Sequence, residues 1–333
     1  MNESAAAFWN RTLAPYKIAD NRVAATQLVT TFALYVAAWW STLRVLEVSF
    51  LLSLPLALLT GFLVIRLFIF QHDCGHGSFF SSQRANNWVG FLLGIITLTP
   101  YQYWRRTHAL HHATSGNLDH RGWGDISTLT VNEYLARSRW DRLRYRLYRN
   151  GIVLLVIGPV YEFVFRQRLP LSAPRDWKRE WTSVMGTNLV LAAAVLGMVN
   201  LVGWKSFLLV QMPIVSFSCG IGIWLFYVQH QFEDTYWERQ ADWDVRLAGL
   251  QGSSFYDLHP VLHWLTGNIG YHHIHHLSSR IPNYRLQQAM AEIPELQNVT
   301  RFGLFESFKC LKLKLWDEEQ KRLVSWDAVK AQA

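Results

Sequence analysis

The most informative stretch of the chain is FLLSLPLALLTGFLVIRLFIF at residues 50–70, which is followed without a break by QHDCGH at residues 71–76. The apolar run has about the 20 residues that an α-helix needs to cross the roughly 30 Å of hydrocarbon in a bilayer. His72 and His76 then stand four residues apart, so on a continued helix both imidazoles lie on one face and can bind the same metal ion. The stretch therefore predicts a metal site at the end of a membrane-spanning helix.

Two further histidine clusters, HALHH at 108–112 and HHIHH at 272–276, share the pattern H-x-x-H-H. On a helix the first histidine of this pattern faces both of the last two. The three clusters together offer eight histidine nitrogens as ligands. Eight are too many for one ion, but they suit two ions that each keep a coordination place open. A ninth histidine ends a later apolar run. The predicted metal ligands are His72, His76, His108, His111, His112, His230, His272, His275 and His276.

The other four histidines are not expected to bind metal. His259 and His263 are four apart, but Pro260 stands between them, and His120 is isolated. His273 is the non-ligand position of its cluster.

Three more apolar runs, at 23–40, 182–202 and 207–229, have spanning length and pair with 50–70 into two hairpins. Nearly all Lys and Arg lie on the side opposite the two short turns. The positive-inside rule then places both termini and every histidine cluster in the cytosol. Half of the residues are apolar, and the 16 Trp and 13 Tyr are typical of membrane interfaces.

Two shorter apolar stretches, 88–104 and 151–165, are marginal in length. If 88–104 crossed the bilayer, the first two histidine clusters would lie on opposite faces, so it is predicted to be a re-entrant or interfacial hairpin. The stretch 151–165 contains Gly158-Pro159 and is predicted to lie along the surface. Residues 230–333 are expected to form a cytosolic cap. The predicted fold is one domain, 1–333, an all-α integral membrane protein with four transmembrane helices in two hairpins and a capped di-metal site.

Neutral imidazoles leave the charge of two metal ions uncompensated, so hydroxide bridges or nearby carboxylates are expected. The candidates are Asp73, Asp119, Glu233, Asp234 and Asp257, for each of which a solvated or helix-capping role is an equal alternative. Imidazole suits iron, copper, zinc and nickel, so the ligand type alone does not choose the metal. The net charge of +8 comes largely from basic residues beside apolar runs, which favours anionic lipid headgroups over nucleic acid as partner.

Four strings resemble the membrane fatty acid desaturase family, whose three histidine boxes read H-x(3,4)-H, H-x(2,3)-H-H and [HQ]-x(2,3)-H-H. They are FQHDCGHGSFF (70–80), WRRTHALHHATSGNLD (104–119), FYVQHQFEDTYW (226–237) and GNIGYHHIHHLSSRIPNY (267–284). The likeness covers about residues 24–284 and is greatest to the ω-6, or Δ12-type, acyl-lipid branch. The first box has three intervening residues, which is within the family's range.

The resemblance implies a di-iron enzyme that uses O2 to remove two hydrogens from neighbouring methylenes of a fatty acyl lipid and releases water. It implies that the nine histidines bind the irons and that an external donor of the ferredoxin or cytochrome b5 type supplies electrons. An unactivated methylene has no acidic proton and no leaving group, so a metal-based oxidant fits this substrate. The alternatives are a di-iron hydroxylase or carotenoid ketolase, a metal transporter, and a lipid-binding scaffold with structural zinc.

Overall fold

The computed structural model describes residues 5–330, and four long helices dominate this part of the chain. They are α2 (Asn21–Leu46), α3 (Phe50–His76), α9 (Lys178–Val202) and α10 (Trp204–His230), and each has the length and hydropathy of a membrane span. The four predicted spans are therefore confirmed as helices. Each is longer than its apolar run because the helix continues through flanking polar residues.

Local sequence explains where these helices begin and end. The Asp20 carboxylate accepts the N–H groups of Arg22 and Val23 and caps α2. The Ser49 hydroxyl caps α3 in the same way, and Gly77 ends α3 with a left-handed φ of 69°. Gly203, with φ 81°, separates α9 from α10.

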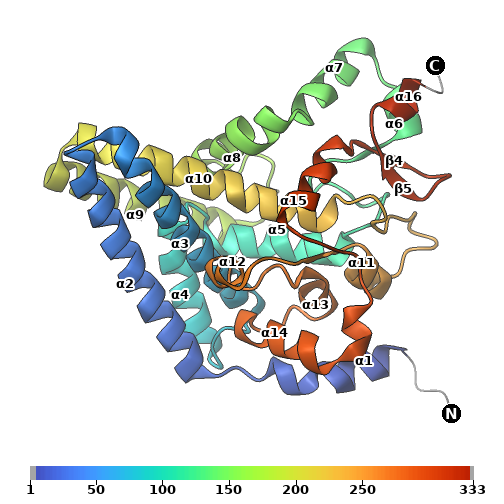
Figure 1. Ribbon diagram of the computed structural model, residues 1–333, viewed down its shortest axis with the longest axis horizontal. Helices are drawn as coiled ribbons and strands as arrows, with labels where there is room; N and C mark the ends of the chain where they lie inside the picture. The colour runs from blue at the N-terminus through green and yellow to red at the C-terminus, as the bar shows by residue number, and fades with distance from the viewer. Residues whose placement is uncertain (1–4, 331–333) are drawn as a thin grey trace.

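Helix α3 is the centre of the bundle and packs against α2, α10 and α4. A Cβ on Gly61 would lie 3.2 Å from the Phe217 Cβ of α10, so the glycine allows the two helices to approach closely. Figure 1 shows the long helices gathered on one side of the molecule and the short elements on the other. The histidine-bearing ends of α3 and α10 both face the short elements.

Helices α4 (Gln83–Ile96) and α5 (Tyr101–Thr114) form a helical hairpin. A Cβ on Gly94 would lie 2.5 Å from the Thr99 carbonyl oxygen, and Leu98 in the turn has a φ of 58°. The predicted stretch 88–104 is thus a tight helical hairpin, and its re-entrant or interfacial position stays a prediction.

Residues 139–168 form a bent, irregular helical segment, of which residues 153–160 pack along α10. Two π-helical turns interrupt it, and its two halves meet at 60°. If the bent pair were one span, the candidate spans would number up to five. The surface position of 151–165 stays a prediction. The pieces are α7 (Arg139–Tyr148), η2 (Val153–Ile157), α8 (Gly158–Val160), η3 (Tyr161–Phe165) and η4 (Arg166–Arg168).

The remaining elements build the cap, to which the N-terminal segment also contributes. Tyr16 packs in the same cluster as Ile274 and donates a hydrogen bond of 2.6 Å to Glu292. The helices are α1 (Ala5–Leu13), η1 (Ala14–Lys17), α6 (Val131–Leu135), α11 (Val245–Gln251), α12 (Pro260–Leu265), α13 (His272–Leu277), α14 (Asn283–Glu292), η5 (Pro294–Gln297), α15 (Leu304–Ser307), η6 (Phe308–Lys312) and α16 (Asp327–Lys330).

The cap also contains short strands, which the all-α prediction did not include. β1 (Leu129–Thr130), β4 (Leu315–Asp317) and β5 (Arg322–Val324) form a sheet in the order β1-β4-β5, with β1 parallel and β5 antiparallel to β4. β2 (Phe255–Tyr256) pairs in parallel with β3 (Arg301–Phe302). The strands tie the segment after the second histidine cluster to the end of the chain.

A buried arginine joins the cap to the bundle. Arg66 of α3 donates to the Thr31 hydroxyl at 3.1 Å and to the Trp264 carbonyl of α12. Its guanidinium also lies 4.2 Å from the centroid of the Trp264 ring. These contacts hold α12 against α2 and α3, beside the histidine-bearing end of α3.

Candidate metal centre

Four helices bring the nine predicted histidines to one place. The last turns of α3 and α5 carry the first two clusters, α10 ends at His230, and α13 begins at His272. The imidazoles form two adjacent groups. Segments that are far apart in sequence therefore converge at one end of the helix bundle.

The first group contains five histidines whose ligand nitrogens all lie within 4.8 Å of one another. The Nε2 atom of His275 is 3.0 Å from those of His72 and His112. Metal–imidazole bonds are about 2.1 Å long, so two nitrogens at right angles on one ion lie about 3.0 Å apart. The observed separations therefore fit a shared ion. The members are His72, His76, His108, His112 and His275.

The second group contains His111, His230 and His276, again with ligand nitrogens within 4.8 Å. The Nε2 atom of His272 lies 3.0 Å from that of His230, so His272 can complete a set of four. The rings of His112 and His276 stack with centroids 4.2 Å apart, which places the two groups next to each other.

Several nitrogens in these groups lack the partner that a buried polar atom normally has. The Nε2 atoms of His76, His111 and His276 are buried and have no hydrogen-bond partner. Burial, helped by the neighbouring imidazoles, holds the pKa of His108, His275 and His276 well below the usual range. A neutral imidazole with a free nitrogen lone pair is the form that binds metal, so the donor set fits a metal centre.

Hydrogen bonds donated by the outer Nδ1–H groups orient the rings. His72 Nδ1 lies 3.0 Å from Asp73 Oδ1, and His230 Nδ1 lies 3.0 Å from the Gly252 carbonyl oxygen. The other carboxylate oxygen of Asp73 accepts two hydrogen bonds from Asn283, at 2.7 and 2.9 Å. Each Nδ1–H therefore points outward, and Nε2 points into the group.

Comparison with known proteins agrees with this geometry. The family model described as fatty acid desaturase matches residues 49–304. The chain belongs to the fatty acid desaturase family. A fatty acid desaturase of Bacillus subtilis (strain 168) is 47% identical over 304 residues, which cover 91% of this chain and 86% of the relative.

Two further relatives of this desaturase chain are more distant. The sn-1 acyl-lipid omega-3 desaturase (ferredoxin) of Synechocystis sp. is 30% identical over 71% of this chain and 66% of the relative. The endoplasmic reticulum omega-3 fatty acid desaturase of Nicotiana tabacum is 30% identical over 67% of this chain and 60% of the relative. The expected resemblance to the family is confirmed, while the relatives do not single out the ω-6 branch.

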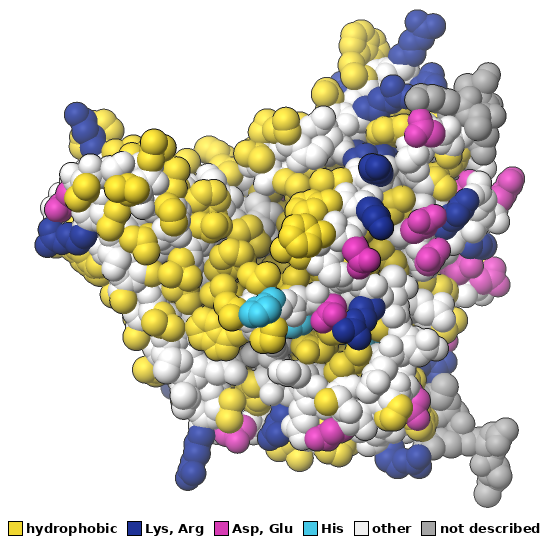
Figure 2. Space-filling model, in the orientation of Figure 1, with side chains coloured by type: hydrophobic (Ala, Val, Ile, Leu, Met, Phe, Trp, Pro, Cys, Tyr) yellow, Lys and Arg dark blue, Asp and Glu magenta, His cyan; other side chains and the backbone are white. Residues whose placement is uncertain are grey.

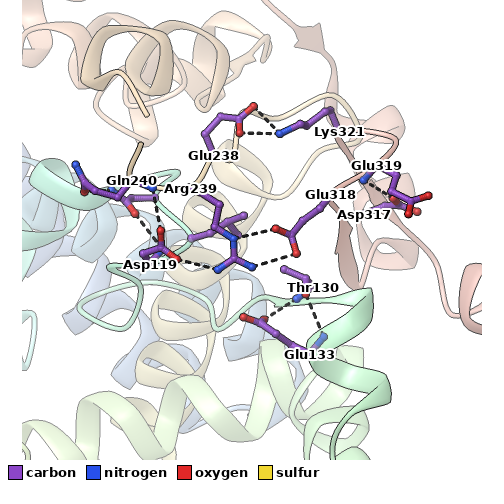
Figure 3. A network of polar contacts seen from close by, with 12 residues as sticks. Asp119, Thr130, Glu133, Glu238, Arg239, Gln240, Asp317, Glu318, Glu319 and Lys321 are labelled. Atoms are coloured by element: carbon purple, nitrogen blue, oxygen red, sulfur yellow. Dashed lines mark hydrogen bonds and ion pairs between the residues drawn. The ribbon is translucent and has the colours of Figure 1, made fainter. Parts of the chain in front are cut away.

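Five carboxylates were predicted to support the metal centre. Within the described residues, Asp73 is the one member of this set that contacts any of the nine histidines. Asp119 pairs with Arg239, which also binds Glu318, and Figure 3 shows this network. Of the remaining three, Glu233 and Asp234 are exposed and Asp257 is half-buried, and two of the three pair with arginines. Glu233 pairs with Arg322, and Asp257 pairs with Arg301. The third of these residues is Asp234. Three of these four carboxylates thus pair with arginines and not with the nine histidines, in agreement with the solvated role that was the alternative for each of them.

Asp125, which was not among the predicted carboxylates, contacts a second histidine of the site. Asp125 Oδ1 lies 2.5 Å from His111 Nδ1, and its Oδ2 is buried without a partner. The approach depends on Gly124, whose φ is 69° and whose Cβ position lies 3.3 Å from the His111 Cβ. The only sequence signal is the pair of glycines, Gly122 and Gly124, which indicates a tight turn just after the second cluster.

The four excluded histidines lie outside both groups. His120 is exposed, and His259 caps the start of α12. His263 Nε2 accepts the Leu258 N–H at 3.2 Å, and His273 Nε2 lies 3.1 Å from the Leu296 carbonyl oxygen. One ring nitrogen of each of His259, His263 and His273 thus contacts the backbone outside the two groups.

Proposed function

We propose that this chain is a di-iron, O2-dependent desaturase that introduces a double bond into the acyl chain of a membrane lipid. The observation that carries the proposal is the convergence of five and four imidazoles into two adjacent groups with metal-ligand spacing. Membership of the desaturase family supports the reaction class. Two irons with O2 would supply an oxidant able to remove two hydrogens from neighbouring unactivated methylenes, and with two electrons from the external donor and two protons the O2 would be released as two molecules of water.

The chain's own residues hold and shield this site. The nine histidines would bind the irons, with Asp73 and Asp125 fixing two of the rings. The Trp104 ring stacks on His108 at 4.5 Å and meets Phe68 edge-on at 5.3 Å. It thus forms an apolar wall beside the first group, which excludes water and suits a hydrocarbon chain.

The relatives and motifs support an acyl-lipid substrate and an external electron donor. One relative's name specifies an acyl lipid and ferredoxin, and a donor of the ferredoxin or cytochrome b5 type fits the proposal. The motif strings favour an ω-6, or Δ12-type, double bond, while the relatives named omega-3 desaturases make the ω-3 position the competing outcome. The distribution of basic residues supports placing the metal site and both termini in the cytosol.

A metal transporter would need ligands along a path through the bilayer. Here the nine histidines gather at one end of α3 and α10. A hydroxylase or ketolase would use the same ligands and differ in the fate of the substrate radical, so the product must decide between them.

The test is expression in a host that lacks polyunsaturated lipids, followed by mass spectrometry of its fatty acids. We expect lipids lighter by two hydrogens, with the double bond located by derivatisation. A product carrying one added oxygen would reject desaturation. His276→Ala should abolish the product while the protein still inserts, whereas His120→Ala, which removes an exposed histidine outside both groups, should leave the product unchanged.

A further inference from the structure

Helix α7 turns its apolar stripe away from the protein. Trp140, Leu143 and Leu147 are 74%, 45% and 55% exposed, and their spacing of three and four residues places them on one helical face. The opposite face, with Tyr145, packs into the cap. An amphipathic helix on a soluble domain buries its apolar stripe in the core, so this stripe needs another apolar partner.

Basic side chains flank the stripe. Asp141 is the only acidic residue of α7, and it is engaged by Ser138 and Arg144. Figure 1 shows α7 projecting from the body, and in the same view Figure 2 shows hydrophobic and basic side chains next to each other there. The basic residues in or just before the helix are Arg137, Arg139, Arg142, Arg144 and Arg146.

We propose that α7 is an interfacial arm that lies in the headgroup region of the bilayer and binds anionic phospholipid. An apolar stripe bordered by arginines is the pattern of a helix that lies in the membrane plane, with its apolar face among the acyl chains and its cations at the phosphates. An acidic partner protein would neutralise the arginines but would not cover the exposed apolar stripe. The stripe also continues through Ile152 and Val156, both well exposed, into the segment that packs along α10.

The arm is anchored to the end of α10. Arg149, at the C-terminal end of α7, is fully buried and donates to Gln231 Oε1 at 2.8 Å and to the carbonyl oxygens of Ser127 and Leu313 at 3.1 Å. Lys314 Nζ in turn donates to the Arg149 carbonyl at 2.7 Å. Because Gln231 follows His230, the arm has a fixed position relative to the second histidine group.

The experiment measures the depth of a spin label on the full-length protein in nanodiscs. A label on Leu143→Cys reports the stripe, and a label on Asn132→Cys, an exposed position in α6, is the matched control. The three native cysteines are buried. In nanodiscs that contain phosphatidylglycerol, we expect the label at 143 to collide more with O2 than with a water-soluble nickel chelate, and the label at 132 to show the reverse. Equal water exposure at both positions would overturn the proposal.

A pair of charge variants tests the anionic part of the proposal. The depth of the label at 143 should differ between phosphatidylglycerol-containing and pure phosphatidylcholine nanodiscs. The double variant Arg139→Gln and Arg144→Gln should abolish this difference. Arg280→Gln with Arg285→Gln removes the same charge at α14, on the other side of the molecule (Figure 1), and should leave the difference intact. An equal response of both double variants, or shielding of the label by self-association in detergent, would contradict lipid binding. The readout involves no enzymatic activity, so it is independent of the desaturase proposal.

Discussion

An imidazole can bind a metal in this site only if its ring is held in one orientation and one tautomer. His72 and His111 receive that constraint from Asp73 and Asp125, because a carboxylate that accepts the Nδ1–H leaves Nε2 free to face the group. His230 receives it from the Gly252 carbonyl. The carboxylates also place negative charge beside a donor set that carries none of its own.

We expect Asp125→Asn to weaken metal binding by about 10- to 100-fold without unfolding the protein. Asparagine preserves the size of the side chain but removes the charge-assisted hydrogen bond to His111. The measurement is the metal content of purified protein across a series of chelator concentrations. Asp119→Asn is the matched control, because Asp119 lies in the exposed network with Arg239 and should retain full metal content. Equal metal loss from both variants would contradict the role given to Asp125.

The sequence could predict the histidines but only part of their surroundings. Helical spacing shows that His108 faces His111 and His112, and it requires no knowledge of the fold. Asp73 was found because it is the neighbour of His72 in sequence. Asp125 was missed because its contact with His111 depends on how the loop after α5 turns back, and a single sequence does not specify that path.

At the scale of elements, the close approach of the segment 153–168 to α10 depends on one glycine. A Cβ on Gly220 would lie 2.7 Å from the carbonyl oxygen of Leu155, which belongs to a π-helical turn. Two residues further along α10, Gly222 has nothing within 4 Å of its Cβ position. The two glycines share a helix and differ in packing.

We therefore expect Gly220→Ala to destabilise the protein by about 1–3 kcal/mol, because a backbone carbonyl cannot move aside as a flexible side chain can. Gly222→Ala should be neutral or slightly stabilising, since alanine favours the helix over glycine by up to about 1 kcal/mol. Thermal unfolding in detergent, followed by tryptophan fluorescence, measures both. Equal unfolding temperatures of the two variants would contradict the packing role of Gly220.

Elements were predictable where a long local pattern specifies them. The four spans follow from apolar runs of bilayer length, and only their ends differ, because capping residues such as Asp20 and Gly77 lie several residues beyond the apolar run. The cap strands have two or three residues, too few for a recognisable alternation. β1 exists because Leu129 pairs with Leu315 from the far end of the chain, and such long-range pairing leaves no local signal.

In the whole molecule, the two histidine groups and Gly203, which separates α9 from α10, lie at opposite ends of α10. This helix has 27 residues, so at 1.5 Å per residue its ends are about 40 Å apart, more than the hydrocarbon thickness. If α10 crosses the bilayer, the histidine groups and Gly203 lie on opposite sides of it. The excess of basic residues on the histidine side favours the cytosol for that side.

We expect a membrane-impermeant maleimide to label Lys205→Cys in intact cells and to label Arg280→Cys only after permeabilisation. Both positions are exposed, and the native Cys74, Cys219 and Cys310 are buried, so the background should be low. The reverse pattern would place the metal site on the outer side, where a cytosolic electron donor has no access. Because the desaturase proposal requires electrons at the iron site, that result would exclude a cytosolic ferredoxin as the donor.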